Sequence, residues 1–226
     1  MNEILKELEG LGCYNVEWKI LDTKENGVPH SRRRWYCIGI HKDFDDGSFA
    51  FPEPIECPSI EDFLERRNSI LAETAPKTNR NAVRNVKTAL KQIRRQCKQD
   101  PLKKAFIVDC DSSPRFFKWV DGVSPCITVS RGGGFWVTNR GRRFTKEEMM
   151  RLQGMNATTF KVGVSMFQLG RQLGNTMSVN VLERLLVRVL PAAQLIHHGD
   201  VKDRWENDSA LRILKETRGK GFHSIL

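Results

Sequence analysis

The stretch Arg142-Arg143-Phe144-Thr145-Lys146-Glu147-Glu148-Met149-Met150-Arg151-Leu152-Gln153-Gly154 carries the start, the body and the end signal of a short helix. Thr145 and Glu148 have the spacing of a capping box, in which each side chain satisfies a free backbone N–H at the start of a helix. Gly154 stands where helices often end, because glycine readily adopts a left-handed conformation. The stretch therefore predicts a helix that runs through Leu152, stops at Gly154 and is held architecturally by ion pairs.

Two further blocks, one on each side of this stretch, contain polar residues and glycines of the kind found in functional loops. Downstream lies Gln172-Leu173-Gly174-Asn175-Thr176-Met177-Ser178-Val179-Asn180, and upstream lies Gly27-Val28-Pro29-His30-Ser31-Arg32-Arg33-Arg34. Consecutive arginines by themselves are more typical of a solvated turn than of a binding site. The order and spacing of the three blocks together carry the functional signal.

In that order, the blocks resemble the arginine motif and the last two motifs of the DNA (cytosine-5) methyltransferases. The family's arginine motif has the form Gln-x-Arg-x-Arg, and His30, Arg32 and Arg34 hold those places here, so His30 departs from the family pattern. The resemblance runs from about Cys13 to Leu190. It implies an α/β fold made of the C-terminal remnant of a Rossmann-like methyltransferase sheet plus a small mixed α+β target-recognition domain.

The resemblance and the prolines at 52, 54 and 58, which mark a linker, predict a division of the chain into four segments. They are the final helix and strands of the catalytic domain (1–50), the target-recognition, DNA-binding domain (51–165), a closing helix that returns to the catalytic domain (166–190) and a polar tail (191–226). A sheet that lacks most of its strands has an unpaired edge and an uncovered face. We therefore expect the isolated chain to be poorly soluble or to associate.

Hydrophobic periodicity predicts the secondary structure around the blocks. Expected helices are 4–12, 79–98, 179–189 (ended by Pro191) and one around 210–214; expected strands are 14–20, 35–40 (buried on both faces), 106–108, 116–120 and 127–129. The helix at 79–98 has one apolar face and one basic face, the latter formed by Arg80, Arg84, Lys87, Lys91, Arg94, Arg95 and Lys98. A solvated surface helix and a face that follows DNA phosphates are equally good interpretations of this pattern.

The resemblance assigns roles to residues in two of the blocks. Arg32 and Arg34 would face the target cytosine once it is swung out of the duplex, since a guanidinium can hold a phosphate or the cytosine oxygen in two-pronged geometry. Asn175, Thr176 and Met177 would line the methionine end of the S-adenosylmethionine pocket. An asparagine that caps a helix without binding a ligand is the alternative for Asn175.

A candidate DNA-binding loop precedes the first stretch. Thr128 and Val129 resemble the Thr-aliphatic pair of the target-recognition domain, and Ser130, Arg131, Gly132 and Gly133 follow as a loop whose glycines permit close approach of backbone to DNA. Arg131 could reach a guanine edge or a phosphate. A glycine run is also the ordinary way to turn a hairpin, so the loop alone is a weak signal.

The family's catalytic groups are harder to find. Its cofactor glycines, Pro-Cys nucleophile and Glu-Asn-Val acid should precede the arginine motif, and none is found upstream of residue 27. Pro125-Cys126 comes after that motif with no Glu-Asn-Val behind it, which favours a small buried thiol in a strand over a nucleophile.

We therefore expect a DNA (cytosine-5) methyltransferase that transfers a methyl group from S-adenosylmethionine to carbon 5 of a flipped cytosine. It should be inactive alone and need a chain that carries the missing motifs. A non-catalytic DNA-binding module, or a regulatory subunit derived from such an enzyme, is the alternative. Mixing this chain with one that carries those motifs would distinguish them: gain of methylation supports the enzyme, and stimulation of an already active partner supports the regulatory subunit.

Composition agrees with a polyanionic partner. The chain has 226 residues and a formal net charge of +10, and clustered Lys and Arg gain free energy by releasing counterions from DNA phosphates. A merely soluble basic surface is the alternative explanation of the charge. The resemblance implies double-stranded DNA as the partner, and the charge agrees with it. The cysteines are spread evenly, without the CxxC pairs of a zinc site, which predicts no metal and reduced thiols. No apolar run approaches the length of a membrane span, so an intracellular location is expected, nuclear if the source is eukaryotic.

Overall fold

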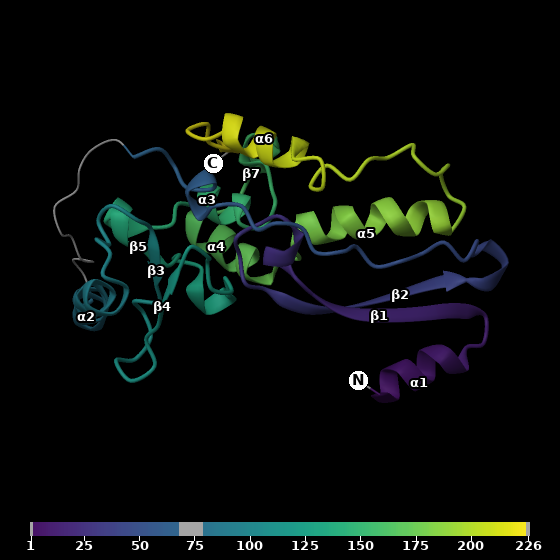
Figure 1. The fold of residues 1–226 in the computed structure, drawn as a ribbon, viewed down its shortest axis with the longest axis horizontal. Coiled ribbons are helices and arrows are strands. Elements are labelled where there is room, and N and C mark those ends of the chain that lie inside the picture. Colours follow the sequence, from purple (N-terminus) through teal and green to yellow (C-terminus); the bar gives the residue numbers. More distant parts are fainter. Residues whose placement is uncertain (1, 68–78, 225–226) are drawn as a thin grey trace.

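The computed structural model describes residues 2–67 and 79–224. The molecule is elongated (Figure 1). A β-hairpin flanked by α1 and α5 forms one end, α2 and a small sheet form the other, and α3, α4 and α6 gather between them. The division into four segments remains a prediction.

The hairpin joins β1 (Tyr14–Asp22) to β2 (Arg33–His41) in antiparallel register, and α1 (Asn2–Gly10) precedes it. Helix α5 (Val179–Ala192) lies along one face of the hairpin, where it closes a core with the strands. The opposite face exposes 44% of Trp18 and 45% of Ile20. The prediction that the second strand is buried on both faces is therefore wrong, because a two-stranded sheet with α5 on one side leaves the other side open.

The small sheet has four short antiparallel strands in the order β4-β3-β5-β6. They are β3 (Phe106–Val108), β4 (Trp119–Asp121), β5 (Trp136–Val137) and β6 (Arg142–Arg143). Alternation along β3 sends Phe106 and Val108 toward α2 (Arg80–Cys97) and Ile107 into the central core. Helix α2 starts at Asn79, whose side chain accepts hydrogen bonds from the first-turn N–H groups of Asn81 and Ala82.

The central core joins segments that are far apart in the sequence. Its buried members include Val28, Phe63, Leu152, Leu173 and Trp205. The elements around it are α3 (Lys146–Arg151), α4 (Met166–Asn175), α6 (Ser209–Glu216) and the parallel pair β7 (Lys161–Val162) and β8 (His223–Ser224). Short 3-10 turns complete the chain at Thr23–Asn26, Lys42–Phe44, Ile60–Asp62, Val129–Arg131, Thr138–Arg140 and Ala157–Thr159.

Several predicted elements are confirmed and several are corrected. The capping box of Thr145 and Glu148 forms at the start of α3. Residues 127–129 are not a strand, because the backbone N–H of Ile127 donates to the side chain of His30 and Val129 begins a 3-10 turn. The strand expected at 116–120 is confined to β4. Helix α5 passes Pro191 and ends at Ala192, since a proline in the last turn removes only its own N–H.

Helix α4 is absent from the sequence-based expectations, which placed a single closing helix here. Its start is a second capping box, between Ser165 and Gln168. Among the described residues, no helix has the length and apolar character needed to cross a membrane. All six cysteines are free thiols.

Candidate active site

Three segments that are distant in sequence line one open groove of about 720 Å³. Strand β2 contributes Arg34, the loop 128–133 contributes backbone and small side chains, and α4 contributes Phe167, Arg171 and its last residue, Asn175. Most residues that the sequence singled out therefore meet in one place. Arg32, Arg131, Thr176 and Met177 are not among the lining residues.

Arg32 lies beneath the groove and holds its walls together. Its side chain is only 5% exposed, and its guanidinium donates to the carbonyl oxygens of Ile127 (2.8 Å), Thr176 (2.7 Å) and Gly174 (3.3 Å). Burial lowers the pKa of this guanidinium from its ordinary value, and the Cys126 thiol beside it acts in the opposite direction. Arg32 is thus built into the scaffold: both terminal nitrogens donate to protein carbonyls, and its buried Nε has no hydrogen-bond partner among the described residues. This is a different place from the one the resemblance implied.

Arg34 is the arginine of the motif that faces solvent. One guanidinium nitrogen donates to the carbonyl of its neighbour Arg33 (2.7 Å), and another lies 3.7 Å from the Cys126 sulfur. Arg34 lines the groove, so it can offer its remaining donors to a ligand there. Cys126 is partly buried, lies outside any strand and does not line the groove, so the expectation of a buried thiol in a strand is wrong in its secondary structure.

His30 explains how the family's glutamine can be replaced. Its imidazole is fully buried, and Nε2 accepts a hydrogen bond from the backbone N–H of Ile127 at 3.0 Å. Burial, and then the positive charge of Arg32, lower the pKa of His30 to about 3. The ring is therefore neutral at pH 7, and it supplies the acceptor that a glutamine side-chain oxygen could also supply.

This buried imidazole predicts a pH-dependent stability. Below pH 6.5 the unfolded chain protonates His30 and the folded chain does not, until pH approaches 3, so the free energy of unfolding falls as pH falls through this window. From pH 7 to pH 5 the contribution of His30 should fall by about 2 kcal/mol. Denaturant titrations of the wild type and His30→Gln at both pH values measure it. An equal pH dependence in the two proteins would contradict the assignment.

The loop 128–133 packs against α4 through glycine backbone. A Cβ added to Gly132 would lie 2.9 Å from the backbone carbon of Gly170, and one added to Gly174 would lie 2.6 Å from the carbonyl oxygen of Thr128. Gly133 has open space around the position of its Cβ. Close packing on α4 accounts for Gly132, and only Gly133 is free to approach a ligand in the way the sequence indicated.

Arg131 is engaged within the protein. Its guanidinium pairs with the carboxylate of Asp109, with Nε 2.8 Å and Nη2 3.0 Å from the two oxygens, and Nη2 also donates to Ser112 Oγ (3.0 Å). This two-pronged pair ties the loop to the end of β3. Contact of Arg131 with a guanine or a phosphate remains a prediction that requires this pair to open.

Helix α4 contributes two groove residues that the sequence reading missed. Phe167 is 73% exposed, and the Arg171 guanidinium carbon lies 5.9 Å from its ring centroid. An exposed aromatic ring beside a cation is a surface on which a base can stack. The signals were present: the Ser165 and Gln168 capping box, and glycines at 170 and 174 spaced for close helix packing.

The predicted cofactor residues fit a ligand in part. Asn175 is exposed in the groove, and its side-chain amide makes no hydrogen bond to the described residues. Thr176 accepts from Arg32 with its carbonyl oxygen and donates from its hydroxyl to the Gln172 carbonyl (2.9 Å), so these two groups are occupied. Met177 is half exposed next to them. Asn175 is the residue of the three with free polar atoms, and it is the last residue of α4, with three residues between it and the start of α5 at Val179.

Several other polar residues of the blocks have structural roles, and for the helix that contains Glu148 the sequence predicted such a role. The carboxylate of the fully buried Glu148 accepts hydrogen bonds from both terminal nitrogens of Arg142, at 2.8 Å from Nη1 and 2.7 Å from Nη2. The side-chain amide of Gln153 donates to the Leu173 carbonyl (2.9 Å), and its backbone carbonyl accepts from the Val179 N–H (2.8 Å). The Asn180 amide donates to the Asn26 carbonyl (2.7 Å). These bonds connect the second and third sequence blocks and attach the third block to Asn26, the residue before the first block.

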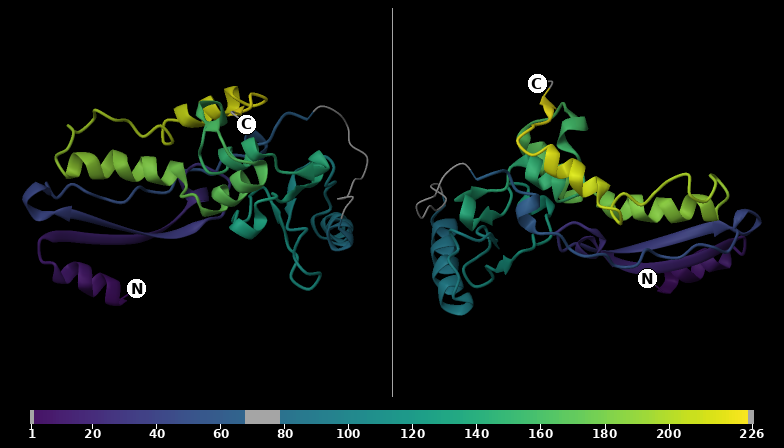
Figure 2. Two further views of the ribbon diagram at one scale, coloured as in Figure 1. Left: turned by 180° about the vertical axis from the view of Figure 1, so that it is seen from behind. Right: turned by 45° about the horizontal axis from the view of Figure 1, so that its top comes forward.

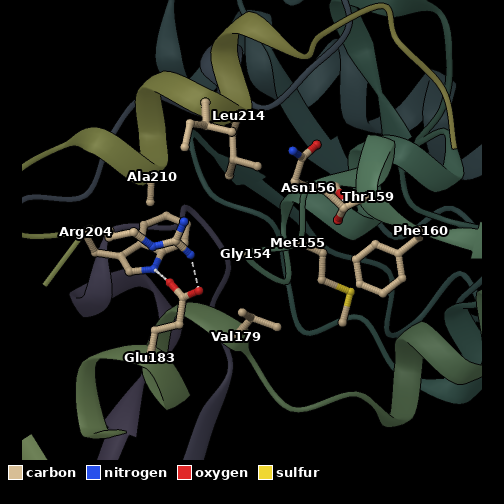
Figure 3. A pocket seen from close by; sticks show the side chains of 12 residues that line it. Gly154, Met155, Asn156, Thr159, Phe160, Val179, Glu183, Arg204, Ala210 and Leu214 are labelled. Atoms are coloured by element: carbon tan, nitrogen blue, oxygen red, sulfur yellow. Dashed lines mark hydrogen bonds and ion pairs between the residues drawn. The ribbon is translucent and has the colours of Figure 1, made fainter. Parts of the chain in front are cut away.

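A second hollow lies away from the groove, between α5, α6 and the turn after α3 (Figure 3). Its volume is about 370 Å³, and its walls are largely apolar. Glu183 points toward Arg204 and pairs with it, and it also accepts from the Trp205 indole N–H (2.7 Å). The charged side chains of this hollow, Glu183 and Arg204, therefore pair with each other. Within residues 2–67 and 79–224, no cluster of His, Cys, Asp and Glu could hold a metal ion.

Comparison with known proteins identifies the family. The model of C-5 cytosine-specific DNA methylases matches residues 1–190. The chain belongs to this family. Methylase relatives agree: the Type II methyltransferase M.NgoBI of Neisseria gonorrhoeae is 29% identical over 190 residues, which cover 80% of this chain and 52% of that protein. M.HaeII of Haemophilus aegyptius is 27% identical over 179 residues, or 79% of this chain and 51% of that protein.

The chain thus spans about half the length of the methylases it matches. A solved structure, the methyltransferase EhMeth of Entamoeba histolytica, superposes with a TM-score of 0.52 at 19% identity, covering 86% of this chain and 59% of that one. This likeness shows a methyltransferase fold, with α/β elements and small antiparallel sheets. The resemblance noted in the sequence, and the remnant fold it implied, are confirmed.

Proposed function

We propose that these 226 residues form the target-recognition and pocket-closing part of an enzyme that methylates carbon 5 of cytosine in double-stranded DNA. One observation carries the proposal. Two of the family blocks meet at one groove beside the loop 128–133, with Arg34 on one side and Asn175 on the other, while Arg32 fixes both walls from below. A chain that had kept the fold only as a scaffold would have no need for polar side chains with available hydrogen-bonding atoms at both sides of this groove.

The residues of the groove have complementary tasks. S-adenosylmethionine, when bound, supplies the methyl group, and Asn175 is the residue with a free amide to hold its polar end. The planar guanidinium of Arg34 can hold the oxygen of a cytosine or a neighbouring phosphate in place. The loop 128–133 presents backbone beside it. Swinging the cytosine out of the duplex exposes its edge to these groups.

The catalytic thiol and acid of the reaction are proposed to come from sequence other than these 226 residues. The open face of the hairpin supports this, because Trp18 and Ile20 are nearly half exposed beside the outer edge of a two-stranded sheet. An apolar sheet face of this kind is stabilised by a covering layer. The part that carries the cofactor glycines is proposed to dock there, in the same polypeptide or in a partner chain, and the isolated chain is expected to associate.

Transfer of tritiated methyl from S-adenosylmethionine to cytosine-containing duplex DNA tests the proposal. We expect no transfer by this chain alone and transfer after it is mixed with a polypeptide that supplies the missing family motifs. The mixture should keep its activity with Cys126→Ser, because Cys126 lies outside the groove.

Four results would change the account. Transfer by the chain alone would mean that a nucleophile within these residues was missed. Loss of transfer in Cys126→Ser would identify that nucleophile. No methyl transfer by the mixture, with DNA binding retained, would favour a non-catalytic DNA-binding module. Stimulation of an already active methyltransferase would favour a regulatory subunit.

A further inference from the structure

Helix α2 carries a continuous basic stripe on its exposed face. The stripe consists of exposed side chains that recur every three or four positions, Arg80, Arg84, Lys87, Lys91 and Arg95, and the exposed C-cap residue Lys98 follows it. None of them forms an ion pair with a described acidic residue. The apolar face of the same helix is fully buried against the small sheet.

This arrangement opposes the stability of the helix. Like charges at spacings of three and four residues repel each other by about 0.2–0.5 kcal/mol per pair. The helix contains no acidic residue that would relieve the repulsion, although Asp or Glu at any of these exposed positions would do so. The stripe is therefore unexplained by folding, and an external polyanion would convert the repulsion into binding free energy.

The geometry favours the backbone of duplex DNA as that polyanion. Helix α2 has 18 residues, so the stripe is about 27 Å long, close to one turn of B-DNA at about 34 Å. Both views place α2 at the outer edge of the molecule, at the end opposite the hairpin (Figure 2). A membrane surface does not fit, because membrane-binding helices insert their apolar face and the apolar face of α2 is buried in the protein.

We propose that the α2 stripe binds phosphates of the same DNA duplex whose cytosine enters the groove. The inference rests on the proposed function, because it assumes that DNA is the ligand of the groove. The contact is independent of base sequence: it fixes the position of the duplex and adds affinity, and the groove reads the target.

Fluorescence anisotropy with a labelled 30-base-pair duplex, at several salt concentrations, tests this contact in the full chain. The variant is the triple substitution Arg84→Gln, Lys87→Gln and Lys91→Gln. The matched control is Lys6→Gln, Lys202→Gln and Lys220→Gln, which removes the same charge from exposed lysines outside the stripe. The α2 variant should bind about tenfold or more weakly at 0.1 M salt, with a salt slope lower by about 2 to 3. The control should stay within about twofold of the wild type, because net charge alone has a small effect on contacts that are screened over a Debye length.

Each outcome decides a separate question. Equal weakening in the two triples, or none in either, overturns the α2 contact and leaves the groove unaffected. A wild-type chain that binds no DNA overturns the proposed function together with the contact. Weakening that appears only with an RNA duplex of the same sequence assigns the stripe to RNA and overturns the proposal. All substituted side chains are exposed, so thermal unfolding should occur at the wild-type temperature and exclude misfolding.

Discussion

Gly174→Ala is expected to lower the free energy of unfolding by about 3 kcal/mol or more, and with it the assembly of the groove. The added methyl group would overlap the backbone N–H of Val129 and lie 2.6 Å from the Thr128 carbonyl oxygen. Backbone atoms on both sides cannot rotate away as a flexible side chain can. Relief requires separation of α4 from the loop 128–133, which are two of the groove's walls. Denaturant unfolding measures the loss.

Gly133→Ala is the matched control for this prediction. It is the same substitution in the same loop, but a Cβ at Gly133 has no heavy atom within 4 Å. We expect its stability to stay within about 0.5 kcal/mol of the wild type. If Gly174→Ala were as stable as Gly133→Ala, the close backbone packing of α4 on the loop would be wrong.

The two arginines of the motif should separate into different phenotypes. Arg32→Ala should cost about 3–5 kcal/mol of stability, because it removes a buried charge that satisfies the carbonyls of Ile127, Gly174 and Thr176. Arg34→Ala should change stability by less than about 1 kcal/mol, since its side chain lies in the open groove and its hydrogen bond is to a neighbouring exposed carbonyl. Thermal and denaturant unfolding of both variants distinguish the roles, and equal stabilities would contradict the division.

Local signals in the sequence were sufficient for much of the fold. The Thr145 and Glu148 capping box acts within a few residues, and the structure has it as expected. The Asn79 cap of α2 and the turn at Gly27, whose φ is 85°, are local features of the same kind. The family blocks also predicted the place of the groove, because Arg34 and Asn175 belong to them.

Contacts between distant residues account for what the sequence could not predict. Nothing near Arg32 indicates that it is buried, since its acceptors stand more than 90 positions away at Ile127 and beyond. From the sequence, Arg131 lies in a glycine-containing loop with no acidic residue nearby. In the folded chain it pairs with Asp109, which is 22 positions away. Residues 127–129 have the composition of a strand, but the N–H that would enter a sheet is taken by His30.

The most direct test of the central claim, that the groove around Arg34 acts on the target cytosine, is the rate of methyl transfer in the complemented mixture with Arg34→Ala. The matched control is Arg33→Ala, the exposed neighbour that does not line the groove. The account predicts that Arg34→Ala lowers kcat by about 100-fold while Arg33→Ala stays within about threefold of the wild type, at unchanged stability. Equal rates for the two variants would contradict it.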